Sequence, residues 1–250
     1  LLILSFLIVP IHSVTIGQIL NVEKFQSKIA DTIRSYNEIG FNASITQNQS
    51  TLYDLNTKTF NFLNKDDFKF MLINNLRLVI LEDQNVISRG YVHFRVTHKT
   101  SKRLESELFL QEQYDAIREL NRRDVQGANL RINLIDGENS SFAIAIGLMH
   151  EFEWWKTSTT TEKSRFLKST NSLLLSLKLT DNLIINSTAY YQFAPTRFKT
   201  PRIIADSRLA WKITETFKIG LTNNFLYDAA PIIPIDKSIS ETSIDLILSF

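Results

Sequence analysis

Two histidines with polar neighbours are the first candidates for chemistry in this chain. Nucleophilic catalysis needs a serine beside a histidine, and the phospholipases of membrane barrels place the histidine, a serine and an asparagine close together on one strand. Here His150 is followed by Glu-Phe-Glu, and His93 is followed by Phe-Arg-Val. Neither run supplies the serine. The sequence therefore predicts no catalytic residue and no enzyme, and a membrane lipase is kept only as a weaker alternative.

Metal and cofactor chemistry is equally poorly represented. The chain has no cysteine and four histidines, of which His12 lies in an apolar N-terminal run. His93 and His98 are five residues apart, which places them on opposite faces of a strand. No set of zinc ligands and no glycine-rich phosphate loop is present. We predict no metal and no cofactor.

Composition narrows the class of protein. The net charge is only +2 over 250 residues, so no strong field suggests a nucleic-acid partner. Mean hydropathy is −0.08. A helical membrane protein would need apolar runs of roughly 18 residues or more, and the chain has none. A membrane barrel hides its apolar surface by alternation, so its average hydropathy stays near neutral.

The N-terminus divides into two expected segments. Leu1–Ile11 is a continuous apolar run, too short to span a bilayer and typical of the core of a signal peptide. We predict a signal peptide over 1–13, truncated at its start, with Ser13 near the cleavage site; a buried N-terminal strand is the alternative. Residues 14–35 have apolar residues at helical spacing, which predicts a short periplasmic N-terminal segment or a disordered leader.

From Tyr36 onward, alternation with a period of two replaces the helical spacing. Between Asp206 and Ile213, for example, Ser207, Leu209 and Trp211 fall on the face opposite Asp206. Twelve such runs are predicted, near 36–47, 52–63, 67–82, 86–98, 103–115, 124–135, 141–154, 166–179, 183–194, 203–213, 217–228 and 238–250. The predicted fold is all-β: an antiparallel transmembrane β-barrel of about twelve strands over 36–250.

The connections between the runs also alternate. Short polar turns at 64–66, 100–102, 136–139, 180–182 and 214–216 are interleaved with mostly longer connections at 116–123, 155–165, 195–202 and 229–237. Short turns on one rim and longer loops on the other are typical of bacterial outer-membrane barrels. An even number of strands places both ends of the barrel on the periplasmic side.

Aromatic residues gather near the ends of the runs, as expected for girdles at the two membrane interfaces. The predicted interface aromatics are Phe68, Tyr114, Phe142, Phe152, Trp154, Phe193, Trp211, Phe217, Phe225 and Tyr227. The last run ends with Ile244, Leu246, Leu248 and Phe250 on one face. A terminal aromatic on such a strand resembles the signal that the barrel-assembly machinery recognises.

The opposite faces of the runs carry charge, which is expensive on a lipid-facing wall and is therefore assigned to the interior. The predicted interior charges, besides His93, are Lys69, Arg77, Arg89, Arg95, Glu105, Glu107, Arg131, Glu151, Lys178, Asp206, Arg208, Lys212, Lys218 and Asp245. Their cationic bias suits small anionic solutes. Twelve strands lie between filled and open barrels, and we favour a filled or narrow interior crossed by salt bridges.

Three arginines, Arg118, Arg122 and Arg123, fall in a predicted external loop. Guanidinium groups pair well with phosphate, so this cluster is a candidate for contact with lipopolysaccharide. Glu119 and Asp124 are adjacent, and a solvated loop is the favoured interpretation.

Three parts of the segment from about Tyr91 to Phe250 carry a family resemblance: the stretches 93–115 and 120–131, and Tyr227-Asp228 with Pro231, Pro234 and the closing strand. On these residues the segment resembles the YdiY-like, salt-induced outer-membrane protein family. Where the family has Gly-x-Gly, this chain has Gly127-Ala128-Asn129. The resemblance implies an outer-membrane barrel and supplies no catalytic residues.

These observations predict an envelope or structural barrel of the bacterial outer membrane, with passive passage of small solutes as an accompanying expectation. Its expected partners are outer-membrane lipid, lipopolysaccharide and the barrel-assembly machinery. The alternatives are a dedicated narrow channel for small anionic solutes and a soluble β-sandwich or lipocalin-like binding protein.

Overall fold

The structure, a computed structural model, is a single antiparallel sheet of twelve strands. It describes residues 34–47, 50–82, 84–214 and 216–248. The strands are β1 (Ser35–Gln47), β2 (Thr51–Lys65), β3 (Phe68–Leu81), β4 (Gln84–Lys99), β5 (Leu104–Asp115), β6 (Leu120–Asp136), β7 (Ser140–Lys156), β8 (Thr161–Thr180), β9 (Leu183–Phe193), β10 (Arg202–Lys212), β11 (Phe217–Asp228) and β12 (Ser238–Leu248). Two short 3-10 helices, η1 (Ala116–Arg118) and η2 (Pro195–Arg197), lie in connections, and neither is long or apolar enough to cross a membrane.

The predicted all-β fold and its twelve strands are confirmed. Two boundaries were predicted too late, because β6 begins at Leu120 rather than 124 and β8 at Thr161 rather than 166. Polar residues such as Arg122 and Lys163 occupy the outward positions there and hid the continuing alternation. The connections 116–119 and 157–160 are consequently short, so the long loops predicted at 116–123 and 155–165 are wrong. Long connections remain at 194–201 and 229–237.

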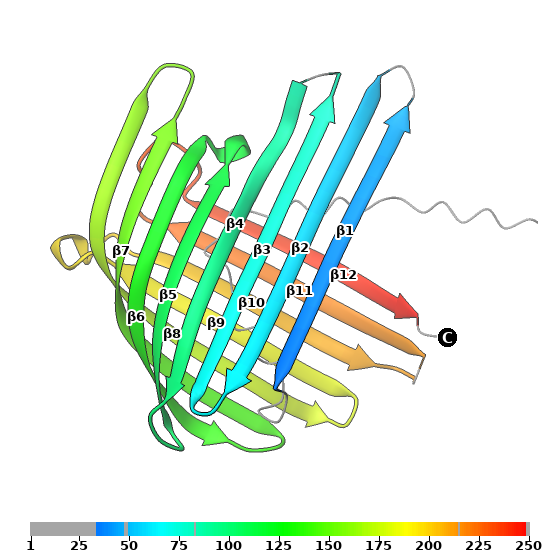
Figure 1. Ribbon diagram of the computed structural model, residues 1–250, viewed down its shortest axis with the longest axis vertical. Helices are drawn as coiled ribbons and strands as arrows, with labels where there is room; N and C mark the ends of the chain where they lie inside the picture. Colours follow the sequence, from blue (N-terminus) through cyan, green and yellow to red (C-terminus); the bar gives the residue numbers. More distant parts are fainter. Residues whose placement is uncertain (1–33, 48–49, 83, 215, 249–250) are drawn as a thin grey trace, which may run out of the picture.

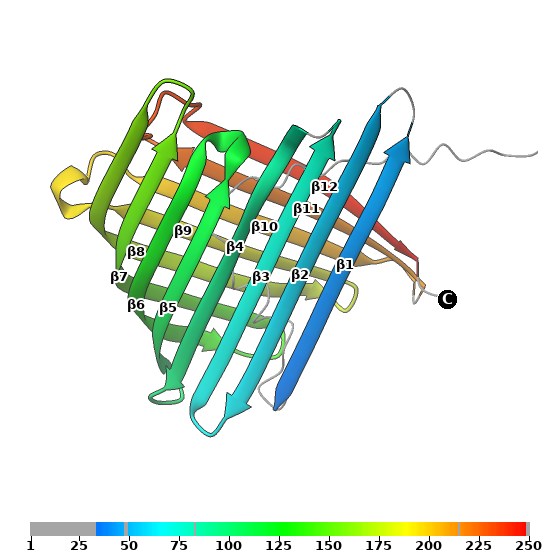
Figure 2. The same ribbon diagram turned by 45° about the horizontal axis from the view of Figure 1, so that its top comes forward.

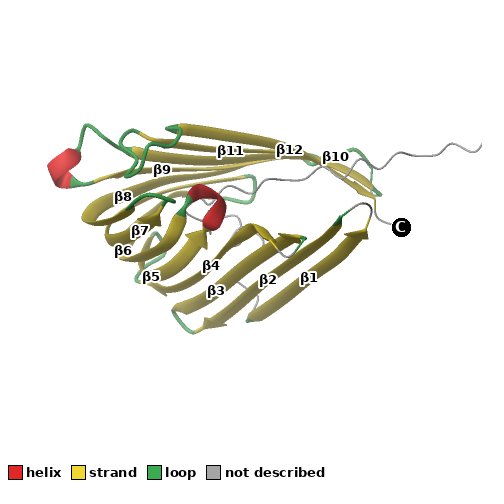
Figure 3. Ribbon diagram, turned by 90° about the horizontal axis from the view of Figure 1, so that it is seen from above, coloured by secondary structure: helices red, strands yellow, loops and turns green. Residues whose placement is uncertain are grey.

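Each strand pairs with its neighbours in sequence, in the order β1 to β12. The sheet curls so that its later strands pass behind its earlier ones (Figures 1 and 2). Seen from above, β12 returns to the same side of the molecule as β1 (Figure 3). Within the described residues no pairing joins β1 to β12, and all thirteen residues of β1 are exposed. The curl is that of a barrel, with β1 and β12 as its two edges.

The two faces of the sheet differ in chemistry as the alternation predicts. On β7, Met149 and Glu151 face inward and are 1% exposed, whereas Ile146 and Leu148 face outward and are 58% and 54% exposed. Apolar side chains thus form the outer surface while charged ones are enclosed, which is the reverse of a water-soluble fold. Smaller apolar clusters also pack inside, one of them formed by Phe60, Phe62, Met71 and Ile73 with Tyr91.

The predicted signal peptide (1–13) and Phe250 lie outside the described residues, as does nearly all of the predicted periplasmic segment (14–35). Ile244 and Leu246, from the predicted assembly signal, lie on the outward face of β12 and are 58% and 66% exposed. Leu248 is the last residue of β12.

Candidate functional site

The register places the predicted interior charges on the inward face of the sheet. Asp245 shares this register position because it pairs with Gly220, and its side chain is not described. Inside, buried or partly buried, lie Lys69, Arg77, Arg89, Arg95, Glu105, Glu107, Arg131, Glu151, Asp206 and Lys212. Lys178, Arg208 and Lys218 share this face but are exposed. Lys178 lies at the short-turn rim, where its Nζ is 2.7 Å from Asp181 Oδ1, and this contact lowers the pKa of Asp181.

The first interior cluster, which we call the wall network, consists of Lys69, Arg95, Glu105, Glu107 and Arg131 on β3 to β6. Glu107 lies 2.8 Å from Arg131 Nη2 and 3.5 Å from Arg95 Nη1. Glu105 lies 3.4 Å from Lys69 Nζ. Asn129 Nδ2 also donates to Glu107, at 3.2 Å. The carboxylates are thereby paired where burial would otherwise be costly.

The rim opposite the short turns, where β5–β6, β7–β8, β9–β10 and β11–β12 are connected, is called the loop rim. The second cluster, the bridge network, lies nearer this rim. It consists of Arg123, Glu151, Glu153, Lys168, Arg202 and Asp228. Arg202 Nη1, from β10, lies 2.9 Å from Glu151 Oε1 and 3.0 Å from Glu153 Oε1, both on β7. Its Nη2 lies 2.7 Å from Asp228 on β11. Arg202 thus spans the interior past β8 and β9.

Two further cations complete the bridge network. Arg123 pairs with Glu151 and lies 3.3 Å from Glu153, while Lys168 pairs with Glu151. Three cations therefore face three carboxylates, and both Glu151 and Glu153 are 1% exposed. Close pairing on this scale offsets the cost of burying charged groups away from water.

A chain of hydrogen bonds runs from His93 on β4 along β5 to the bridge network. His93 Nδ1 lies 3.1 Å from Gln111 Oε1, and Gln111 Nε2 donates to Gln113 Oε1 at 2.7 Å. Arg123 Nη1 donates to the same Gln113 oxygen at 3.1 Å. His93 is therefore a member of a buried polar chain, with its Nδ1 beside the Gln111 amide.

The β11–β12 connection, 229–237, folds over the bridge network. Its Ile233 is 3% exposed and packs against Leu120 of β6 and Trp155 of β7, with Ile232 and Ile235 beside it. A pocket of about 30 Å³ lies between this connection, Arg202 and Trp155. That volume holds about one water molecule. The connection and the bridge network therefore pack closely against each other at this point.

Sequence reasoning missed most of the bridge network. Arg123 and Arg202 fall in the predicted loops 116–123 and 195–202 but lie in β6 and β10, so the predicted loop cluster of Arg118, Arg122 and Arg123 is wrong. Arg123 is buried inside at 3% exposed, Arg122 lies on the outer wall, and Arg118 lies beside the interior, where burial lowers its pKa and Asp115 opposes that shift. One sequence signal could have placed Arg123 correctly. Arg123, Val125 and Gly127 alternate with polar residues, as a strand does, and in the structure Arg123 and Val125 pair with Glu153 and Glu151.

On the outer wall, the ten predicted interface aromatics all share the outward face. Phe68 and Trp211 lie near the short turns and are 43% and 50% exposed. Phe152 and Trp154 lie near the loop rim on β7, and the Nζ of Lys163 lies 4.6 Å from the centroid of the Trp154 ring. The arrangement is that of two aromatic bands on one oily surface.

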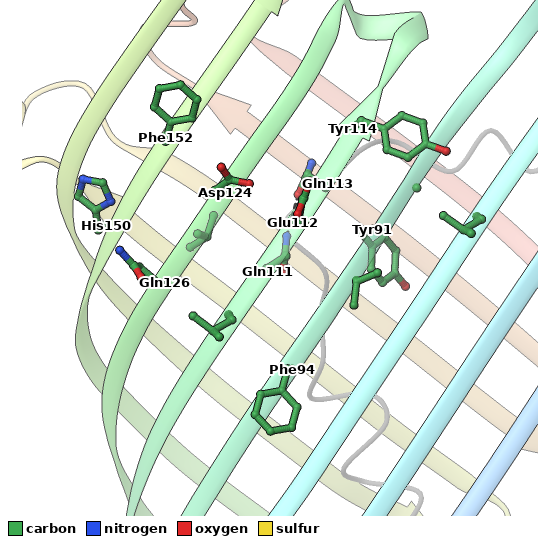
Figure 4. Close-up of a pocket in the computed structure, with 15 residues that line it drawn as sticks. Tyr91, Phe94, Gln111, Glu112, Gln113, Tyr114, Asp124, Gln126, His150 and Phe152 are labelled. Carbon is green, nitrogen blue, oxygen red and sulfur yellow. Dashed lines mark hydrogen bonds between the residues drawn. The ribbon is translucent and has the colours of Figure 1, made fainter.

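A groove of about 790 Å³ runs over the outward face of β4 to β7, below the loop rim. Figure 4 shows Tyr114 on one side and Phe152 on the other, with Glu112 and Asp124 between them. Gly90 leaves room for Tyr114 to lean across β4, because a Cβ there would lie 3.0 Å from Tyr114 Cε1. The groove is therefore apolar toward the middle of the wall and polar toward its rim.

His150 lines this groove and faces outward. Arg165 Nε, on β8, donates to His150 Nε2 at 2.7 Å. In the described part of the chain no group of three or more histidine, cysteine or acidic residues is arranged to hold a metal ion. The groove offers polar and charged contacts.

No protein-family model and no curated protein matches the chain. Two solved structures are similar over 86% of this chain. One is the NanC porin, with a TM-score of 0.45 and 8% identity over 99% of that chain. The other is the TodX monoaromatic hydrocarbon channel, with a TM-score of 0.37 and 9% identity over 78% of that chain. The similarity is too distant to transfer a function.

Proposed function

We propose that this chain is an outer-membrane β-barrel of the cell envelope whose interior is obstructed at the loop rim, rather than an open pore. The observation that carries the proposal is the seating of Ile233 against Leu120 and Trp155, above the bridge network. Open porins leave an aqueous channel, whereas here the loop and Arg202 occupy it. We also propose that the chain is related to the YdiY-like family. The barrel-assembly machinery would then recognise β12 during insertion.

The outer wall supports placement in a membrane. Phe142 and Trp154 face outward on β7, twelve residues apart. At roughly 3.3 Å per residue and a tilt of about 45°, they differ in height by roughly 28 Å. The apolar band of outer-membrane barrels is about 25 Å tall. One aromatic would therefore lie at each interface.

A membrane barrel also requires closure, because an open sheet edge leaves backbone groups unpaired in lipid. We propose that β1 and β12 pair once the chain is in a bilayer. Hydrogen exchange followed by mass spectrometry tests this: the amides of 35–47 should be protected in vesicles nearly as well as those of β6. Rapid exchange throughout 35–47 in a folded sample would contradict closure.

Planar-bilayer recording tests the obstruction. The full chain should show little conductance, and a variant with 231–235 replaced by a short Gly-Ser linker should show stable openings. Shortening 196–199, an exposed stretch of the β9–β10 connection, is the matched control and should stay silent. Large, steady conductance from the unaltered protein would refute the obstructed interior.

A narrow path for small anions is the second candidate. It is favoured by the short-turn half of the interior, where Arg208 is exposed and Lys212 is partly exposed on one side of the barrel. If this path exists, the linker variant should pass chloride in preference to potassium, and Arg208→Gln with Lys212→Gln should reduce that preference. Cation selectivity would exclude it.

A further inference from the structure

We propose that the outer wall over β7 and β8 binds the phosphate groups of lipopolysaccharide through Lys163 and Arg165. The proposal rests on the membrane placement proposed above, in which the loop rim is the outer one. It replaces the loop cluster expected from the sequence with a different set of cations, brought together by strand register.

The register arranges this part of the wall in two rows. Trp154 on β7 pairs with Arg122 on one side and Lys163 on the other. One row nearer the middle of the wall, Phe152 pairs with Asp124 and with Arg165. Lys163 and Arg165 therefore lie next to each other on the outward face of β8, beside two aromatic rings.

The charges on the two sides of these rings differ. Arg122 is neutralised within the wall, since its Nε lies 2.9 Å from Asp124 and 3.4 Å from Glu112. Lys163 contacts the face of Trp154, and Arg165 donates to the ring nitrogen Nε2 of His150. Among the described residues, neither Lys163 nor Arg165 has a carboxylate partner. A pair of uncompensated cations thus stands at the upper edge of an oily surface.

The surroundings specify the class of anion. Immediately toward the middle of the wall lie Leu148 and Leu167, 54% and 55% exposed, and the groove continues this apolar surface past Leu110. A small soluble anion would meet the cations but cover none of the apolar surface. A phosphate-bearing lipid satisfies both, because guanidinium and ammonium groups pair with phosphate while acyl chains cover the leucines. In the outer leaflet that lipid is lipopolysaccharide.

Lipid binding by the full chain tests the proposal. The protein is first folded into phosphatidylcholine nanodiscs, and purified lipid A is then titrated and counted by native mass spectrometry. Lys163→Gln with Arg165→Gln should weaken binding roughly tenfold or more, given the attraction that each basic residue near a membrane surface contributes. Lys102→Gln with Arg103→Gln removes the same charge at the opposite rim and is the matched control. Lys163→Arg should retain binding.

Three results would overturn the proposal. They are equal binding by the double variant and its control, equal binding of lipid A stripped of its phosphates, and displacement of lipid A by millimolar inorganic phosphate, which would indicate a free anion as the ligand. Failure of the chain to fold into nanodiscs at the first step would refute the membrane placement itself. The two failures are therefore distinguishable.

Discussion

The wall network and the bridge network use the same side-chain chemistry but differ in what they connect. In the wall network, Arg95 and Arg131 reach Glu107 from the two strands beside β5, and Lys69 reaches Glu105 past one strand, β4. The bridge network joins β10 to β7, which the ladder does not connect directly. Ion pairs within the wall therefore add to a sheet that the backbone already holds together. Arg202 instead ties together strands that are not neighbours, and its side chain crosses the interior beneath the 229–237 connection.

The largest effect is expected at Arg202. Arg202→Ala leaves three carboxylates facing two cations and should lower the free energy of unfolding by about 3–5 kcal/mol. Urea titration of the protein folded in vesicles measures the loss. Arg202→Lys keeps the charge without the forked geometry and should lose less. A loss at Arg202→Ala no larger than that at Arg131→Ala would break the distinction between bridge and wall.

In the wall network the matching change is smaller. Arg131→Ala removes the 2.8 Å contact between Arg131 and Glu107. Glu107 still has Arg95 as a partner, at 3.5 Å. A loss of about 1–3 kcal/mol is expected for a buried partner that remains partly satisfied. The same urea titration measures it, and conductance should stay unchanged because this network lies along the wall. New channel openings in this variant would assign the obstruction to the wrong network.

Lys69 should matter less again. Its Nζ lies 3.4 Å from Glu105 and both side chains are partly accessible, at 19% and 10%. Partly exposed ion pairs contribute about 0–1 kcal/mol, so Lys69→Met should unfold at nearly the wild-type urea midpoint. A shift as large as that of Arg131→Ala would show that the wall network acts as one unit.

The smallest effect is expected at the short-turn rim, outside both networks. Lys178 holds the pKa of Asp181 below its ordinary value. A carboxyl group whose pKa is lower in the folded protein stabilises it above the ordinary pKa, and this contribution fades as the pH falls through the lowered value. NMR titration of Asp181 should show the lowered pKa and its return toward the ordinary value in Lys178→Gln. An unchanged titration curve in Lys178→Gln would show that Lys178 does not lower the pKa of Asp181.

The strands and their faces could be predicted from sequence because alternation is a local property. Trp211 and Asp206 fall on opposite faces in the sequence and in the structure. The pairing of charges is not local: Arg202 and Glu151 are 51 residues apart, and no pattern indicates which carboxylate a given arginine meets. Arg202 directly follows Pro201 in a predicted loop, which concealed its strand position. The curl that brings β10 toward β7 depends on the whole sheet.

Trp154 and Trp155 are consecutive residues on opposite faces of β7. The ring of Trp154 lies on the outer wall under Lys163, while Trp155 is 4% exposed inside, with its Nε1 donating to Glu153 at 3.1 Å. Two indoles separated by one peptide bond thus lie on the outer wall and in the interior at the same height. Spectroscopy on single-tryptophan variants, with Trp211 also replaced, can report lipid docking through Trp154 and displacement of the loop through Trp155, without any attached dye.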